Sequence, residues 1–162
     1  MEAFEMANKT LVAYESKSGA TEESARKIAD VLRSKYKLDV DLVDLGKQKI
    51  ADCSLYENIV IGGGVRAGKV YGKALKCLEN DWTGKKVAFF VSAGQAGDPK
   101  TYESAKAKFA EKTLANYPNI KPVGWEAFGG RMIILGKKLY DTVDLAKAEA
   151  WAEELGKKFT NQ

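Results

Sequence analysis

The chain has 162 residues, of which 45% are hydrophobic and 30% are charged, and it carries a net charge of +4 without a single histidine. This length fits one globular domain that buries roughly 70% of its unfolded surface, and the balanced composition excludes a disordered or fibrous chain. The absence of histidine excludes the commonest general base, the commonest metal ligand and every Ser/His or Cys/His catalytic pair.

The N-terminal residues show no targeting pattern, and the two cysteines show no metal-binding pattern. Residues Met1 to Lys9, a short N-terminal extension, lack the basic start and apolar core of a signal peptide, and no apolar run reaches the ~20 residues of a membrane span. We therefore expect a cytoplasmic protein. Cys53 and Cys77 lack metal-ligand or redox spacing and are expected to be reduced. The small basic excess without a motif predicts no nucleic-acid partner.

The first predicted elements are a strand, a loop and a helix. Thr10 to Tyr14 is apolar, Ser16 to Thr21 is rich in hydroxyl groups, and the helical pattern of residues 21–36 follows. Because the first N–H groups of a helix lack partners, this loop predicts an anion site, with Thr21 capping the helix. Ordinary turn and capping residues explain the same sequence equally well.

The next predicted strands differ in their exposure. Leu38 to Leu45 alternates apolar and acidic residues and predicts an edge strand, whereas Asn58 to Ile61 is wholly apolar and predicts a central strand. The central strand is expected to end at Gly62-Gly63-Gly64. A glycine-bearing loop from Val65 to Gly72 and a short helix from Lys73 to Asn80 follow.

The second half of the chain repeats this alternation. Val87 to Val91 predicts another central strand, and it runs into the small residues Ser92 to Gly97. Asp98-Pro99 has the form of a helix start, and the helix is predicted to extend to Tyr117. A strand at Pro122 to Phe128, a break at Gly129-Gly130 and a closing helix at Thr142 to Phe159 complete the pattern.

Five strands that alternate with four helices predict an α/β domain with a parallel sheet and helices on both faces. Ligands of such sheets bind beyond the carboxyl ends of the strands. Here the loops that begin at Ser16, Gly62 and Ser92 occupy this edge, and all three are rich in glycine or serine. The sequence therefore predicts a cofactor site between them.

Two nucleotide-binding motifs are matched only loosely. Residues Gly63 to Lys69 approach a triphosphate-binding loop, but Val70 stands where a Ser or Thr must hold magnesium. Gly62-x-Gly64-x-x-Ala67 resembles the dinucleotide fingerprint, although no helix starts directly after it. Neither motif predicts triphosphate hydrolysis or dinucleotide binding.

The Ser-x-Ser-Gly-x-Thr spacing of Ser16 to Thr21 resembles the flavodoxin phosphate-binding signature, Ser/Thr-x-Thr-Gly-x-Thr. The resemblance extends over essentially the whole chain, and the segment Ile59 to Leu75 is most similar to the flavodoxin-type, menaquinone-dependent protoporphyrinogen dehydrogenases. It implies a three-layer sandwich over residues 1–162, with a five-stranded parallel sheet in the order 2-1-3-4-5.

The resemblance also implies an FMN cofactor and its binding residues. The phosphate would lie on Ser16, Lys17, Ser18, Gly19, Ala20 and Thr21. The isoalloxazine ring would lie between two loops, held by Gly62, Gly63, Gly64, Val65, Arg66, Tyr71, Ser92, Ala93, Gly94, Gln95 and Gly97. Flat cover for the ring is expected from Val65 and Tyr71 on one side and from Gln95 or Trp82 on the other.

The segment Arg131 to Leu139 is open to two interpretations. Its apolar residues, bracketed by basic ones, suit a docking loop for a quinone, a porphyrin carboxylate or a membrane surface. The porphyrinogen dehydrogenases carry a longer insertion at about this point. A partly buried strand extension leading to the last helix is the simpler interpretation, and we favour it slightly.

The function predicted from these features is that of an FMN-dependent redox protein, in which the cofactor carries the electrons. A one-electron carrier that serves a redox partner protein competes with an oxidoreductase acting on a quinone or porphyrinogen. A non-catalytic binding module on the same fold is the alternative of another class. Its signalling version needs clustered acidic residues after the first strand, where only Glu15 stands.

Overall fold

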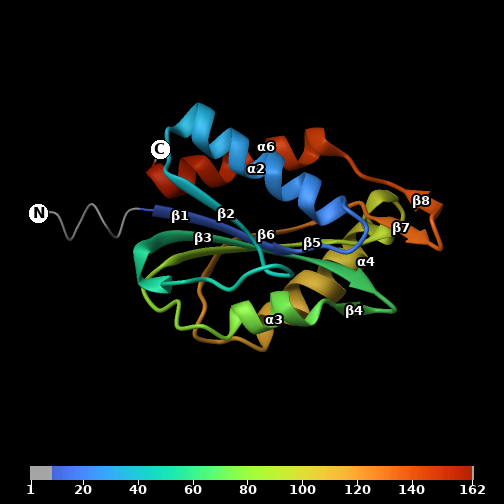
Figure 1. Cartoon of the computed structure of the whole chain (residues 1–162), viewed down its shortest axis with the longest axis horizontal. Coiled ribbons are helices and arrows are strands. Elements are labelled where there is room, and N and C mark those ends of the chain that lie inside the picture. Colours follow the sequence, from blue (N-terminus) through green and yellow to red (C-terminus); the bar gives the residue numbers. More distant parts are fainter. Residues whose placement is uncertain (1–8, 162) are drawn as a thin grey trace, which may run out of the picture.

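A computed structural model describes residues 9–161; residues 1–8, most of the predicted N-terminal extension, and residue 162 lie outside the described part. Five parallel strands form the central sheet in the spatial order β2-β1-β3-β5-β6 (Figure 1). They are β1 (Lys9–Glu15), β2 (Val40–Asp44), β3 (Tyr56–Arg66), β5 (Lys86–Ser92) and β6 (Pro122–Phe128). This confirms the predicted order 2-1-3-4-5 and places the alternating strand β2 at the edge.

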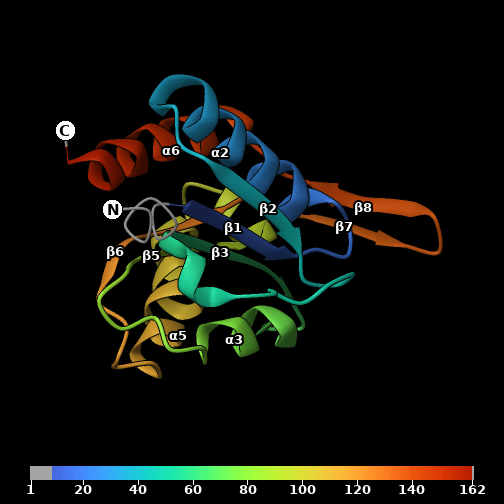
Figure 2. The ribbon, with the colours of Figure 1, turned by 60° about the vertical axis from the view of Figure 1, so that its left-hand side comes forward.

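Helices cover both faces of the sheet, as Figures 1 and 2 show. One face carries α2 (Ala20–Tyr36) and α6 (Leu145–Thr160), which pack against each other. The other face carries α3 (Gly72–Leu78) and a helical segment made of α4 (Tyr102–Ala105), a π-helical stretch (Lys106–Glu111) and α5 (Lys112–Ala115). Short 3-10 turns lie at Cys53–Leu55 and Gly94–Gly97. The three-layer sandwich is therefore as predicted.

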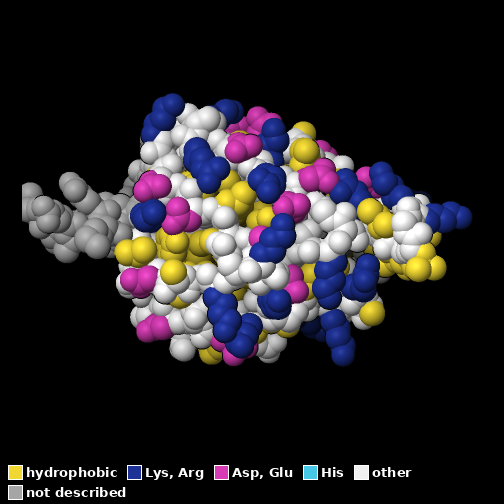
Figure 3. Space-filling model, in the orientation of Figure 1, with side chains coloured by type: hydrophobic (Ala, Val, Ile, Leu, Met, Phe, Trp, Pro, Cys, Tyr) yellow, Lys and Arg dark blue, Asp and Glu magenta, His cyan; other side chains and the backbone are white. Residues whose placement is uncertain are grey.

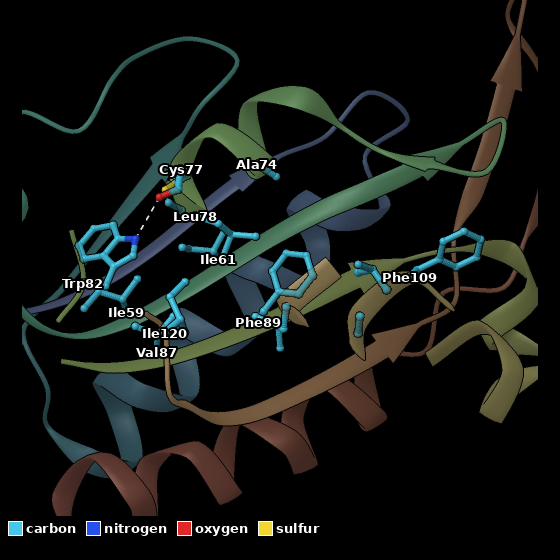
Figure 4. Packing of buried hydrophobic residues seen from close by; sticks show 14 of the residues in the cluster. Ile59, Ile61, Ala74, Cys77, Leu78, Trp82, Val87, Phe89, Phe109 and Ile120 are labelled. Carbon is cyan, nitrogen blue, oxygen red and sulfur yellow. Dashed lines mark hydrogen bonds between the residues drawn. The ribbon is translucent and has the colours of Figure 1, made fainter. Parts of the chain in front are cut away.

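Each face of the sheet has its own hydrophobic core. Under α2 and α6, the rings of Phe90, Phe128 and Trp151 lie 5.5 to 6.0 Å apart, tilted or edge to face. Figure 4 shows the opposite core, in which Trp82 is buried and its Nε1–H donates to the carbonyl oxygen of Cys77 at 2.9 Å. Trp82 was proposed as flavin cover from the sequence, and this part of the prediction is wrong.

The strand register brings the carboxyl ends of three strands together. Tyr14 of β1 pairs with Gly62 of β3, and Gly64 of β3 pairs with Ser92 of β5. The chain that leaves β1 therefore starts beside the ends of β3 and β5. This is the edge at which parallel sheets bind ligands.

The glycines 62–64 belong to a strand and not to a loop, contrary to the sequence prediction. Strand β3 continues through them to Arg66 and turns back into the short antiparallel strand β4 (Lys69–Val70). A central strand accepts glycine where a neighbouring group approaches closely. Here the ring of Phe90 covers Gly62, and Ala74 of α3 covers Gly63.

Two predicted helix starts lie three residues too early. After Asp98-Pro99 the chain remains in turns, because Thr101 Oγ1 donates to the carbonyl oxygen of Gln95 at 2.6 Å, and the helix begins only at Tyr102. The closing helix begins at Leu145. Its cap is Asp144, whose Oδ1 accepts from the backbone N–H of Ala146 at 3.1 Å.

The segment after Gly130 forms an antiparallel two-stranded hairpin, β7 (Arg131–Ile134) and β8 (Lys137–Asp141). Figure 2 shows it projecting from the body of the molecule. Its base is fixed by the N–H of Thr142, which donates to the carbonyl oxygen of Gly130 at 2.8 Å. The favoured interpretation, a partly buried strand extension leading to the last helix, is therefore right about the strands, but only the base of the hairpin is half-buried and most of it is exposed. Within residues 9–161, no helix has the length and apolar character needed to cross a membrane.

Candidate functional site

The loop between β1 and α2 has the geometry of an anion site. Gly19 is the N-cap of α2 in the left-handed region, with φ of 91°, and no side chain of the described residues caps this helix. Ser16 Oγ accepts from the N–H of Gly19 at 3.2 Å and holds the loop closed. The predicted capping role of Thr21 is wrong, because Thr21 lies buried inside the first turn. Uncapped amides at a helix N-terminus attract anions.

Two glutamates in the first turn of α2 are paired with other groups. Glu22 accepts a hydrogen bond from Tyr14 Oη at 2.9 Å, and this bond lowers the pKa of Glu22. Glu23 forms an ion pair with Arg131, which comes from β7. Their charges are thus partly compensated. Glu15 is also occupied, because its Oε1 accepts from the N–H of Lys73 at 2.7 Å, in the first turn of α3.

Ser92 supplies an unpaired buried hydroxyl group at the end of β5. Its side chain is 4% exposed, and Oγ has no hydrogen-bond partner among the described residues. Such a group costs free energy unless a ligand or water satisfies it. Ser92 lines the same pocket as Ser16, Ser18 and Thr21. A polar ligand in this pocket would satisfy the hydroxyl.

Tyr71 forms one aromatic wall of the pocket. Its ring lies over Gly64, where a Cβ atom would be only 2.6 Å from Tyr71 Cε2. Lys17 Nζ lies 4.5 Å from the centre of the same ring, a cation–π distance. Burial raises the pKa of Tyr71. The third glycine of β3 therefore makes room for an aromatic ring.

The hairpin base adds three residues that the sequence prediction did not include: Gly130, Arg131 and Tyr140. Arg131 is only 15% exposed, and its Nη1–H donates to the carbonyl oxygen of Ser18 at 3.3 Å, over the hydroxyl-rich loop. Its hydrogen bond to Glu23 raises the pKa of Arg131. The ring of Tyr140 packs on Gly94, where a Cβ atom would lie 2.6 Å from Tyr140 Cε1. An aromatic ring thus reaches the loop of residues Ser92 to Gly97 from another part of the chain.

The predicted residues divide between the pocket and its surroundings. Eight line the pocket together with Tyr71: Ser16, Lys17, Ser18, Ala20, Thr21, Gly64, Val65 and Ser92. Gly19 lies directly beside it, under the guanidinium of Arg131. The remaining seven do not line it: Gly62, Gly63, Arg66, Ala93, Gly94, Gln95 and Gly97. Among these, Arg66 and Gln95 are exposed, and Gly97 packs against Thr142.

The pocket between these walls is narrow. It encloses about 20 Å³, whereas sites for drug-sized ligands usually measure ~300 to 1,000 Å³. The long side chains of Lys17, Tyr71, Arg131 and Tyr140 line it. Any planar ligand must therefore displace these side chains, while the loop and Ser92 need not move.

A larger cavity of about 540 Å³ lies between residues 45–53 and α3. Its polar wall consists mainly of exposed lysines, among them Lys73 and Lys76. No buried side-chain group without a partner lines it. Within residues 9–161, no three carboxylate or cysteine side chains are grouped to hold a metal ion. The pocket at the strand ends is therefore the better candidate site.

Comparison with known families agrees with this geometry. The family model of the flavodoxin domain matches residues 11–147, which include the hydroxyl-rich loop, β3, β5 and the hairpin. The chain belongs to the flavodoxin family. No curated protein sequence matches this flavodoxin-family chain significantly.

Several solved flavodoxin structures are similar along nearly the whole chain. Oxidised flavodoxin 1 from Bacillus cereus has a TM-score of 0.64 at 20% identity, covering 95% of this chain and 98% of its own. Flavodoxin 2 from the same organism has a TM-score of 0.63 at 24% identity, covering 93% and 99%. A flavodoxin from the domain Archaea gives 0.60 at 17%, covering 94% and 99%. At these identities the likeness establishes the shared fold.

Proposed function

We propose that the chain binds FMN in the pocket at the strand ends and transfers electrons through the bound flavin to and from a redox partner protein. The observation that carries the proposal is the buried, unpaired hydroxyl of Ser92, which shares one pocket with the uncapped N-terminus of α2. Proteins of the flavodoxin family bind a flavin, usually FMN. A bound flavin supplies one- and two-electron transfer chemistry.

The donors present fit the two ends of this cofactor. A phosphate group suits the amides of the first turn of α2 and the hydroxyls of Ser16, Ser18 and Thr21. Arg131, which is paired with Glu23 and Asp141, places its guanidinium donors over the same loop. Among the other predicted contacts, Ser92 offers a hydroxyl and Val65 an apolar surface for the ring.

The two tyrosines suit the faces of a planar ring. Tyr71 lies between β4 and α3, and Tyr140 lies on β8 of the hairpin, so that both rings line one pocket from different elements. Aromatic side chains cover flat ligands well because they stack with little loss of conformational entropy. We therefore assign to Tyr140 the cover of the second ring face, in place of Gln95 or Trp82.

Among FMN-dependent redox functions, we prefer that of an electron carrier. The pocket holds no histidine, and Glu15, the carboxylate nearest to it on β1, is occupied as a cap of α3. Carrying electrons through a flavin requires no side chain to act as an acid or base. An oxidoreductase acting on a quinone or protoporphyrinogen remains the second candidate. It is favoured by the apolar hairpin beside the pocket.

The carrier and the oxidoreductase differ in how the bound flavin is reduced. In a titration with dithionite, a stable half-reduced species supports the carrier. Direct two-electron reduction, followed by reoxidation when a quinone is added, supports the oxidoreductase. A protein that never takes up flavin supports the third alternative, a non-catalytic binding module.

The binding proposal is tested with a matched pair of serine variants. Ser92→Ala removes the hydroxyl that FMN would satisfy, so we expect FMN affinity to fall about two- to tenfold, the value of one hydrogen bond. The stability of the free protein should stay unchanged or rise, because the unpaired group is removed. Ser24→Ala is the control, since Ser24 Oγ is equally buried and unpaired but does not line the pocket.

Fluorescence quenching of FMN measures both affinities, and urea denaturation measures both stabilities. If Ser92→Ala and Ser24→Ala lose FMN affinity equally, Ser92 affects binding only through its effect on the fold and does not contact the flavin. Unchanged affinity in both variants, with FMN still bound, would place the flavin elsewhere in the molecule.

A further inference from the structure

The tip of the β7–β8 hairpin, residues Ile133 to Leu139, concentrates exposed apolar side chains. Leu135 is fully exposed, and Leu139, Ile134 and Ile133 are 54%, 47% and 38% exposed. Only Trp125, on β6, is a comparably exposed large hydrophobic residue elsewhere in the described chain. Figure 3 shows the apolar surface at this end of the molecule, with lysine and arginine side chains around it. Clustered exposure of this kind marks an interaction surface.

The backbone at the tip argues against an ordinary turn. Leu135 and Gly136 form a two-residue connection in which both residues have positive φ, 51° and 76°. Such turns favour Asn-Gly, and a bulky branched residue in this region is strained. Leu135 is therefore strained by the backbone conformation of the turn, and its apolar side chain is fully exposed to solvent. A binding role explains both features.

The charges near the tip are positive. Lys137 and Lys138 follow the turn, and the single carboxylate of the hairpin, Asp141, is paired with Arg131 and Lys138. The β3–β4 turn projects at the same end of the molecule, as Figure 1 shows, and adds the exposed residues Arg66 and Lys69. Lys137 and Lys138 pair with Ile134 and Ile133 across the hairpin, so the surface is an apolar tip flanked by lysines.

The direction of the apolar side chains decides between two kinds of partner. Successive residues of a strand point to opposite faces, so Ile133 and Ile134 project on both sides of the ribbon, with Leu135 at its end. A flat protein surface covers one side only. A lipid surface, in contrast, surrounds an inserted tip on all sides, while anionic head groups attract the long side chains of the lysines that flank the isoleucines.

We propose that the hairpin tip inserts into the surface of a membrane that contains anionic lipids, as a peripheral anchor. Because Arg131 and Tyr140 at the hairpin base line the pocket, the anchor would bring the pocket mouth close to the lipid surface. The proposal goes beyond the redox function and does not depend on flavin binding.

The test is sedimentation of the full-length chain with lipid vesicles. We expect binding to vesicles of phosphatidylcholine mixed with phosphatidylglycerol, and much weaker binding to phosphatidylcholine alone. Leu135→Asn should weaken binding about tenfold, since a leucine contributes that much or more on leaving water. Lys137→Gln should weaken it about fivefold.

The matched control is Ala67→Asn in the β3–β4 turn. Ala67 and Gly68 also have positive φ, 53° and 77°, so the change creates the same Asn-Gly turn without removing a large apolar group. This variant should bind vesicles like the unchanged chain. Leu135→Asn should not destabilise the protein, because Asn-Gly suits the turn better than Leu-Gly. A loss of vesicle binding therefore cannot be ascribed to unfolding.

Three results would overturn the proposal. The first is no binding of the unchanged chain to phosphatidylglycerol vesicles. The second is equal binding of Leu135→Asn and the unchanged chain. The third is self-association in analytical ultracentrifugation that Leu135→Asn abolishes, because the tip would then serve a second copy of the chain.

Discussion

Gly62 offers a direct test of why three glycines occupy the centre of β3. The sequence suggested a loop that lets a cofactor approach, whereas the structure places the ring of Phe90 over Gly62. A methyl group at this position would overlap three ring carbons, even the most distant of which is 2.7 Å away. We therefore predict that Gly62→Ala destabilises the fold, although Gly62 does not line the pocket.

The size of the effect follows from how firmly Phe90 is held. Its ring is fully buried, 5.5 Å from the ring of Phe128 and 6.0 Å from that of Trp151. Since the ring cannot move aside freely, the substitution should cost about 1–3 kcal/mol, as overpacking usually does. For a domain of this size, each kcal/mol lowers the melting temperature by roughly 2–4 °C.

The assay is urea denaturation of Gly62→Ala beside Gly72→Ala. Gly72 opens α3, has no left-handed φ, and a Cβ there meets nothing within 4 Å. Alanine at Gly72 should therefore be neutral or stabilise the protein by up to about 1 kcal/mol. A double variant that combines Gly62→Ala with Phe90→Leu should relieve part of the overlap. Its loss of unfolding free energy should therefore be smaller than the sum of the losses in the two single variants. Wild-type stability of Gly62→Ala, or strict additivity with Phe90→Leu, would refute the packing explanation.

Three further predictions concern the fold and its titratable groups. The Tyr14 hydrogen bond lowers the pKa of Glu22, so the stability it contributes is present above the unfolded pKa of about 4.3 and is lost as pH falls through the folded value. Tyr14→Phe should lower the free energy of unfolding at pH 7 and flatten its decline on acidification in urea titrations; identical profiles would contradict this. Asp144→Ala removes the cap of α6 and should cost about 0.5–2 kcal/mol in the same assay, and an unchanged midpoint would contradict it. Burial raises the pKa of Cys77 to about 12, so a thiol reagent at pH 8 should modify the half-buried Cys53 first and Cys77 only on unfolding; equal rates in the native protein would contradict this.

The parts of the site that the sequence predicted are those with local signals. A strand, a hydroxyl-rich loop and a helix follow one another between Thr10 and Tyr36, and their geometry is set by neighbouring residues. The strand order of the sheet was also predicted correctly, because only a few topologies are possible for apolar strands that alternate with helices. Even here one detail was wrong, since Gly19 caps α2 through its backbone and Thr21 does not.

Arg131 and Tyr140 were missed because tertiary structure brings them to the pocket. They lie more than 100 residues after the hydroxyl-rich loop, and only the pairing of β7 with β8 places both at the hairpin base. A signal was nevertheless present. Leu135-Gly136 stands between two short strands and carries glycine at the second position of a two-residue turn. Recognising that hairpin would have predicted its base beside Gly130.

The glycines of β3 show the opposite error. Glycine is the commonest sign of a turn, and three in succession after Ile61 indicated a loop. In a central strand, however, glycine also marks close approach by a neighbouring group. The ring of Phe90 comes from β5, and the ring of Tyr71 reaches Gly64 only because β3 turns back into β4, so neither approach could be read from the glycine run itself.

The most direct measurement is the visible spectrum of the full-length chain after incubation with excess FMN and gel filtration. The proposed function predicts a yellow protein that retains about one FMN per chain, and weaker retention of riboflavin, which lacks the phosphate for the Ser16–Thr21 loop. A colourless protein after gel filtration, or equal retention of FMN and riboflavin, would contradict the assignment of this pocket to FMN.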